Sequence, residues 1–150
     1  MTMHHRFVAT PVLLALFAHV AWAAGCDAPP ATLKPGTAAG LSGPAARFGG
    51  TWQGQWPVAV SGHIEPICAR VYVLISSATT ATVEQCTGSN RGARRRPQCK
   101  RYAAAVNGNV MTFTDAEGTV FTFAMADVGG MEAEAVSARH RSGTVFTKAP

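Results

Sequence analysis

The sequence lacks the patterns that usually identify an enzyme. It has no Gly-rich phosphate loop, no nucleophile elbow and no pair of carboxylates spaced for acid–base catalysis. Beyond the first 23 residues it has two histidines, His63 and His140, and neither has a Ser or Cys nucleophile motif beside it. His63 and Glu65 could form an acid–base pair, but a histidine in a loop is more often simply exposed. The sequence therefore predicts a protein that is not an enzyme.

Helix periodicity and metal-ligand spacings are absent as well. Beyond the N-terminal region, no stretch repeats its apolar residues with the 3.6-residue period of a helix. The cysteine spacings do not match a zinc site. No cofactor or metal is predicted, and with 150 residues the prior is one domain, monomeric by default.

The first 23 residues have the features of a secretory signal peptide. A weakly basic start precedes an apolar run over residues 7–21, and Ala21-Trp22-Ala23 fits the small-x-small cleavage rule. The run is too short and too interrupted for a good membrane-spanning helix, and no later stretch could span a bilayer. The Ala, Gly and Arg bias is what a GC-rich bacterial genome would give. We therefore expect a periplasmic or secreted protein.

Four cysteines, an even number, suit an oxidising compartment. Cys86 and Cys99 flank a polar basic loop, so one pairing joins them and leaves Cys26 to bond Cys68. The rival joins Cys68 to Cys86 and Cys26 to Cys99, and spacing alone does not decide between them. A minority interpretation makes Cys26 the lipidated residue of a lipoprotein, but its lipobox is poor and lipidation would leave an odd thiol.

Two segments follow the signal peptide. Residues 24–47 are rich in Ala, Pro and Gly and lack periodicity, which predicts a flexible leader with little packing of its own. Residues 48–150 carry the strand patterns and form the predicted folded domain.

The stretch from Arg101 to Met131 predicts an antiparallel meander. Asn107-Gly108 suits a two-residue type I′ turn, which would set Ala104 opposite Met111 and Tyr102 opposite Phe113. Residues 115–118 and 126–129 each suit a turn closed by a left-handed Gly. These two turns set Phe113 opposite Phe121, Met111 opposite Phe123 and Met125 opposite Met131. All three turns place the large apolar side chains on one face, and a slip of one residue would destroy that face.

The flanking segments add further strands. In residues 49–58, Trp52, Gly54 and Trp56 share one face, and residues 59–66 are predicted to be a loop. Residues 68–76 and 79–86 suit a hairpin with Val71 opposite Val83. The last turn is expected near residues 141–143, with a two-residue or a three-residue loop. About eight short strands predict an all-β fold, an up-and-down meander that closes into a small barrel or a strongly curved sheet.

Gly50-Thr51-Trp52 is similar to the Gly-x-Trp that opens lipocalin-like and avidin-like (calycin) barrels. The longer pattern from Gly50 to Trp56, with Phe146-Thr147-Lys148 near the end, also resembles a small domain of secreted bacterial proteins. The later tryptophans that avidins place around biotin are missing, as are the second lipocalin motif and its C-terminal helix. The resemblance implies a barrel fold and does not imply biotin binding.

The first functional hypothesis is a binding module that holds a small apolar molecule or a lipid in the barrel. It is based on the large side chains of the apolar face and on the calycin resemblance. The alternative is that side chains fill a small barrel completely. The candidate ligand-binding residues of the interior are Trp52, Trp56, Tyr102, Phe113, Phe121 and Phe123.

The second hypothesis is an interaction protein that presents a basic loop to an anionic envelope component or to a protein partner. Six cations fall within eleven residues with no acid among them: Arg91, Arg94, Arg95, Arg96, Lys100 and Arg101. Arginine suits bidentate contact with phosphate, although a run of charge is more often a solvated surface. Nucleic acid is an unlikely partner, because no aromatic residue interleaves the cluster for base stacking.

Overall fold

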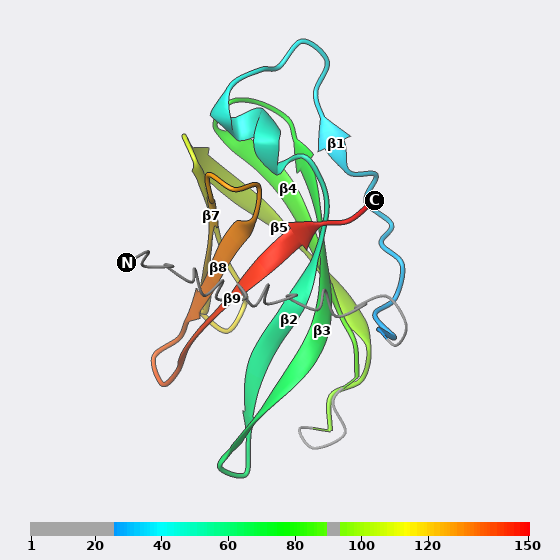
Figure 1. Ribbon diagram of the computed structural model, residues 1–150, viewed down its shortest axis with the longest axis vertical. Coiled ribbons are helices and arrows are strands. Elements are labelled where there is room, and N and C mark those ends of the chain that lie inside the picture. The colour runs from blue at the N-terminus through cyan, green and yellow to red at the C-terminus, as the bar shows by residue number, and fades with distance from the viewer. Residues whose placement is uncertain (1–25, 90–93) are drawn as a thin grey trace, which may run out of the picture.

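The computed structural model describes residues 26–89 and 94–150, which form nine β-strands and one short 3₁₀ helix (Figure 1). The predicted signal peptide and Arg91 lie outside the described residues. In chain order the elements are β1 (Gly36–Thr37), η1 (Pro44–Phe48), β2 (Gly50–Val60), β3 (His63–Ile75), β4 (Thr80–Thr87), β5 (Gln98–Asn107), β6 (Val110–Thr114), β7 (Val120–Met125), β8 (Met131–Val136) and β9 (Arg141–Lys148).

Strands β2 to β9 form a closed antiparallel barrel. Each strand pairs with its neighbour in the sequence, and β9 returns to β2, where Trp52 lies opposite Lys148. The strand β1 is an extra one that pairs in parallel with the end of β3. This architecture confirms the predicted all-β, up-and-down barrel. Closure also removes the open sheet edges that a curved sheet would leave.

The predicted apolar face of the meander is the inside of the barrel. Met111 lies opposite Phe123, Phe113 opposite Phe121, and Met125 opposite Met131, as expected. Gly118 and Gly129 have the left-handed conformation that these two turns require, with φ of 83° and 84°. The fully buried large side chains of the core are Phe48, Trp52, Val71, Val73, Ile75, Val83, Met111, Phe123, Met131 and Phe146.

Two predicted registers are wrong by two residues. Met111 lies opposite Val106 rather than Ala104, and Val83 lies opposite Val73 rather than Val71. In the β5–β6 hairpin the two turn residues are Gly108 and Asn109 rather than Asn107 and Gly108. Only Gly108 of the predicted pair has a positive φ (57°), so the predicted type I′ turn is not formed. A shift of two residues keeps every side chain on its predicted face, because the strand period is two.

The predicted loop at residues 59–66 is wrong, since β2 and β3 continue as a long hairpin. Val60 lies opposite His63 across a Ser61-Gly62 turn, where both residues have positive φ (47° and 84°). Pro57 lies opposite Pro66. Neither proline has an N–H to donate to a neighbouring strand. The pair is tolerated because β9 and β4 do not pair with this part of the hairpin.

The last turn also differs from both predicted loop lengths. Val136 pairs with Arg141, which leaves the four-residue loop 137–140 before the predicted position. Ser137 organises this loop, because its hydroxyl accepts hydrogen bonds from the backbone N–H groups of Arg139 and His140. Serine is a common turn residue for this reason.

One end of the barrel is closed by η1, and we call this end the base. Phe48 at the end of η1 is fully buried. The Trp52 indole Nε1–H donates to the Phe48 carbonyl oxygen at 2.8 Å, and Lys148 Nζ lies 5.0 Å from the centre of the Trp52 ring. The lower tip of the β2–β3 hairpin in Figure 1 lies at the opposite end, which we call the mouth.

The predicted flexible leader is held against the barrel at several points, although Gly40 and residues 42–44 are exposed. Cys26 is bonded to Cys68 on β3, and the β1 residue Gly36 pairs with Leu74. These contacts could not be read from the leader itself, because it has no strand or helix period and its hydrogen-bond partners Glu84 and Ser89 lie fifty or more residues further along the chain. In the described residues, no helix is long and apolar enough to cross a bilayer.

Candidate functional site

A cavity of about 1080 Å³ opens at the mouth of the barrel. It lies between the β2–β3 hairpin and the connections that follow β4, β6 and β8. Its lining residues come from seven of the eight barrel strands and from all three of these connections. A volume of this size is at the upper end for sites that take small molecules.

Small and polar residues at the inward positions leave this space. Inward side chains on β4 and β5 run from Val83 and Tyr102 to Gln85 and Lys100 as the strands approach the mouth, and Ala135 holds an inward position on β8. At the base, by contrast, Phe48, Trp52 and Phe146 fill the interior and are buried completely or almost completely. The cavity is therefore a consequence of side-chain size along a regular barrel.

The cavity has an aromatic floor. Trp56 and Ile67 are buried, while Tyr102 and Phe121 are half-buried. The Trp56 ring meets Phe121 edge-on at 5.8 Å, and Phe113 stacks between Tyr102 (4.6 Å) and Phe121 (4.9 Å). Edge-on and stacked arrangements are favourable for aromatic pairs. The floor is thus an apolar surface on which an apolar group can pack.

Trp56 has one further property. Among the described residues, its Nε1 is the one buried side-chain nitrogen or oxygen without a hydrogen-bond partner. Leaving a buried donor unpaired costs about 1–3 kcal/mol. Edge-on rings of Phe121, Phe123 and Phe146 surround the indole and offer at most weak N–H···π contacts.

Of the six candidate interior residues, the structure brings three to the cavity: Trp56, Tyr102 and Phe121. The other three, Trp52, Phe113 and Phe123, are buried and are not among the residues that line it. Alternation showed that all six face inward, but it could not show at which level of the barrel each one lies. The lining residue Ile67 was missed because it falls between the predicted loop 59–66 and the predicted strand 68–76.

Charged side chains surround the cavity, and we call them the rim. Arg95, Arg96 and Lys100 come from the connection to β5 and from β5 itself, and Arg139 comes from the turn between β8 and β9. Asp115 and Glu117 line the same cavity. Four cations against two carboxylates give the rim a net charge of +2, with His140 left out of the count. Sequence reasoning missed Arg139, because nothing local connects it to a cluster some forty residues earlier.

The remaining basic-loop residues are placed elsewhere. Arg94 is exposed and does not line the cavity. Arg101 projects from the outer face of β5 and forms an ion pair with Glu84 on β4, with Nη2 and Oε2 2.7 Å apart. It also donates to the Thr32 hydroxyl at 2.6 Å. The basic cluster is therefore divided between a cavity rim and a structural contact.

Glu84 fixes the leader to the outer face of the barrel. Its carboxylate is buried (4% exposed) and accepts hydrogen bonds from the backbone N–H groups of Thr32 (3.1 Å) and Leu33 (2.8 Å). Burial alone would raise the pKa of Glu84, but the hydrogen bonds from Arg101, Thr32 and Leu33 outweigh it and hold the pKa below its usual range. The carboxylate is therefore charged and fully partnered at neutral pH.

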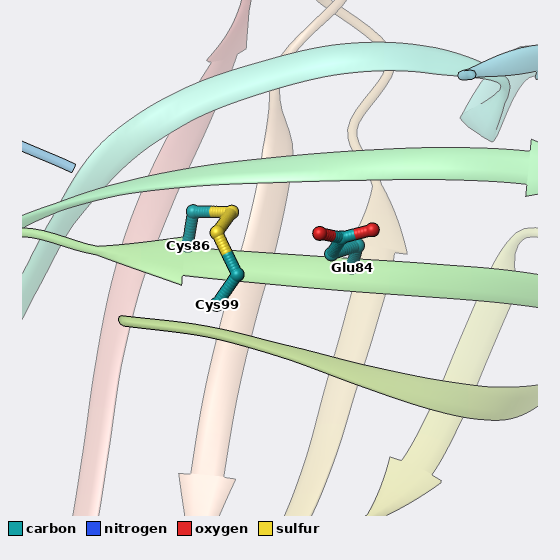
Figure 2. A group of neighbouring side chains, drawn as sticks. All are labelled: Glu84, Cys86 and Cys99. Atoms are coloured by element: carbon teal, nitrogen blue, oxygen red, sulfur yellow. A yellow bond between two sulfur atoms is a disulfide. The ribbon is translucent and has the colours of Figure 1, made fainter. Parts of the chain in front are cut away.

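Glu84 also lies beside a disulfide on the same face of the sheet (Figure 2). Cys86 and Cys99 are directly opposite one another on β4 and β5 and are bonded, and Cys26 is bonded to Cys68. This confirms the first of the two predicted pairings. Although the ligand atoms of Glu84, Cys86 and Cys99 lie within 4.8 Å of each other, the sulfurs are bonded and the carboxylate is engaged, so the cluster is structural.

The rival pairing fails for a reason of register, because Cys86 lies opposite Arg70 rather than Cys68. The minority lipoprotein interpretation fails too, because the Cys26 sulfur cannot carry both a disulfide and a lipid. A second leader contact reinforces the disulfide: the Asp27 carboxylate accepts hydrogen bonds from the Ser89 hydroxyl and from its backbone N–H (2.8 Å). The Ser89 hydroxyl, followed by its N–H, lowers the pKa of Asp27.

Tyr102 brings a phenol to the floor of the cavity. Burial raises its pKa, and the carboxylates of Asp115 and Glu117 raise it further. The phenol is therefore neutral and can donate or accept a hydrogen bond. His63 and Glu65, the conceivable acid–base pair, lie near the tip of the β2–β3 hairpin, and neither lines the cavity.

No protein-family model and no curated protein matches this sequence. One solved structure with the same fold is described as a de novo design of a fluorescence-activating β-barrel. The similarity covers 73% of this chain and all of that chain, with a TM-score of 0.52 and 16% sequence identity. At this identity the likeness supports the barrel fold alone.

Proposed function

We propose that this protein is a secreted or periplasmic, non-catalytic binding module that holds a small apolar ligand or a lipid chain in the mouth of a calycin-like barrel. The observation that carries the proposal is the open cavity above the floor of Trp56, Ile67 and Phe121. An eight-stranded barrel has an interior just wide enough either to be filled by side chains or to hold one small ligand. Here the base is filled and the mouth is not.

Two further observations support the cellular address and the capacity to bind. Two disulfides, which use all four cysteines, are consistent with an extracellular or periplasmic location and accord with the signal-peptide pattern of residues 1–23. The barrel with the same fold is described as fluorescence-activating. That description belongs to the designed protein, and it motivates the use of a fluorescent probe here.

The experiment is a titration with N-phenyl-1-naphthylamine, a neutral apolar dye that brightens in apolar sites. The wild-type protein is expected to bind it saturably, one dye per chain. Ala135→Phe, an inward substitution in the cavity, is expected to weaken binding at least tenfold, since it occupies the space. Ala124→Phe, on the outer face of the neighbouring strand β7, is the matched control. Equal binding by both variants would overturn the proposal.

A second candidate function is recognition of an anionic envelope component or a protein by the basic loop. It is favoured by the exposure of Arg94, Arg95 and Arg96, which lie side by side at the mouth end. Replacing all three by Ser should abolish salt-sensitive binding to anionic vesicles while leaving the thermal unfolding midpoint unchanged. Unchanged vesicle binding would dispose of this candidate.

Native mass spectrometry of the unreduced protein would show whether a small molecule co-purifies.

A further inference from the structure

The positively charged rim favours a ligand that carries negative charge, which an apolar cavity alone would not require. We propose that the ligand is an amphipathic anion: an apolar body that packs on the floor and one anionic head group that lies among the rim cations. This inference rests on the proposed function and specifies the ligand class of the same site. It joins the two hypotheses from the sequence, because the basic residues and the apolar floor belong to one cavity.

The register places Lys100 inside the mouth. Lys100 lies opposite Gln85, one inward position nearer the mouth than the facing pair Val83 and Tyr102. Both Lys100 and Gln85 line the cavity. The Lys100 side chain is exposed at the mouth, so water solvates its charge when no ligand is bound. Because Lys100 lines the same cavity as Tyr102 and Phe121, its ammonium group can reach an anionic head group on a ligand that packs on these two rings.

Cations also stand on the far side of the opening. Arg139 belongs to the turn between β8 and β9, while Arg95, Arg96 and Lys100 belong to the β4–β5 side. In the barrel order, the β6–β7 turn and the β2–β3 hairpin separate these two groups. A head group between them can therefore meet cations from both sides. Arginine adds bidentate geometry to that attraction.

The carboxylates of the rim do not cancel this attraction. Asp115 is committed to its own turn, where its Oδ1 accepts the backbone N–H groups of Glu117 (2.9 Å) and Thr119 (2.8 Å). Within the described ranges 26–89 and 94–150, the ion pairs are Arg101 with Glu84 and Arg141 with Glu134. Both pairs involve arginines outside the rim. The rim therefore keeps its net positive charge for a ligand.

The test compares three ligands with the same ten-carbon chain in competition with N-phenyl-1-naphthylamine at pH 8: decanoate, decanol and decylammonium. Decanoate is expected to bind about tenfold more tightly than decanol, with decylammonium the weakest. Decyl phosphate, run alongside, distinguishes a phosphate from a carboxylate head group. The advantage of the anions should shrink in 0.5 M salt, because exposed charges are screened.

Variants locate the head group. Lys100→Ser and Arg139→Ser are each expected to reduce the preference for decanoate over decanol at least threefold. Lys34→Ser removes the same charge from the exposed leader and is the control. Equal affinities for decanoate and decanol would overturn this inference and leave the apolar site standing. Failure of all three ligands to displace the dye, or of the dye to bind, would overturn the proposed function itself. A preference that survives both rim substitutions would overturn the placement of the head group.

Discussion

The base and the mouth of this barrel are built from the same strands but are stabilised by different means. At the base, Phe48, Trp52 and Phe146 are completely or almost completely buried, and η1 covers the opening. At the mouth, cross-links replace packing: Cys86–Cys99 lies beside the cavity residues Thr87 and Gln98, and Cys26–Cys68 lies beside Ile67. The difference shows how a small barrel can give up core volume at one end and still hold its shape.

The largest expected effect comes from the base. Phe48→Ala should lower the free energy of unfolding by about 3–5 kcal/mol, because it removes a fully buried ring and leaves a void. Phe121→Ala at the half-buried floor of the mouth should cost about half as much. Urea unfolding followed by tryptophan fluorescence measures both. Equal decreases in the free energy of unfolding would mean that the base and the mouth are packed equally well, which would contradict the difference described above.

Cross-links are the next largest contribution, and they belong to the mouth. In the chain-entropy model, Cys86→Ser with Cys99→Ser should cost about 3 kcal/mol, and Cys26→Ser with Cys68→Ser about 4 kcal/mol. The order follows from sequence separations of 13 and 42 residues. Denaturant unfolding of each double variant tests this order. The reverse order would show that strain or residual structure, rather than loop length, governs these bonds.

Glu84 should have an intermediate effect. Glu84→Gln replaces an acceptor of two leader N–H groups and the partner of Arg101, so it should cost about 1–3 kcal/mol. Glu134→Gln, which breaks the exposed pair with Arg141, is the matched control and should leave stability close to that of the wild type. Thermal unfolding at neutral pH measures both variants. A loss at Glu134 as large as that at Glu84 would contradict the burial argument.

The same carboxylate predicts a dependence on pH. Its pKa is lower in the folded protein than the usual 4.5, so its stabilisation is complete above pH 4.5 and is lost as the pH falls through the folded pKa. Below that range the leader should loosen before the base unfolds. Hydrogen exchange at the Thr32 and Leu33 amides should accelerate in wild type on acidification. In Glu84→Gln it should already be fast at neutral pH, and slow exchange there would contradict the assignment.

The smallest expected effect lies beyond the mouth, at the tip of the β2–β3 hairpin. Ile64 is 67% exposed, so Ile64→Ser should change stability by less than about 0.5 kcal/mol. Ile67→Ser, three residues later on the same strand, replaces a buried floor residue and should destabilise strongly. Thermal unfolding of the two variants marks where the cooperative barrel ends. A large loss at Ile64 would extend the packed structure into the hairpin.

Much of the barrel could be predicted because strand alternation and turn chemistry are local. Trp52 and Trp56 were assigned to the buried face from alternation alone, and Gly118 and Gly129 from turn type. Errors of two residues at Gly108 and in the β3–β4 hairpin left the faces intact. The alternation of apolar and polar residues therefore determines which side chains face inward. The turn sequence determines the pairing register less strictly, because either of two adjacent dipeptides can form the turn.

The leader contacts and the cavity could not be predicted because they join residues that are far apart in the sequence. Thr32 and Leu33 are held by Glu84, some fifty residues away, and no local pattern connects them. Arg139 and Lys100 line one cavity only because the barrel closes. The basic cluster was visible in the sequence, but its division between the rim and the Arg101–Glu84 pair depends on which face of β5 each residue occupies.

The Cys26–Cys68 bond has a consequence for engineering. It closes a covalent ring that contains the Ser61-Gly62 turn at the exposed hairpin tip. Cutting the backbone at that turn would therefore leave two pieces, one ending at Ser61 and one beginning at Gly62, still joined through sulfur. A protease site inserted there would yield a nicked protein that runs as one species on a non-reducing gel and as two after reduction. The tip is thus a natural position for grafted peptides or for new chain termini in a permuted barrel.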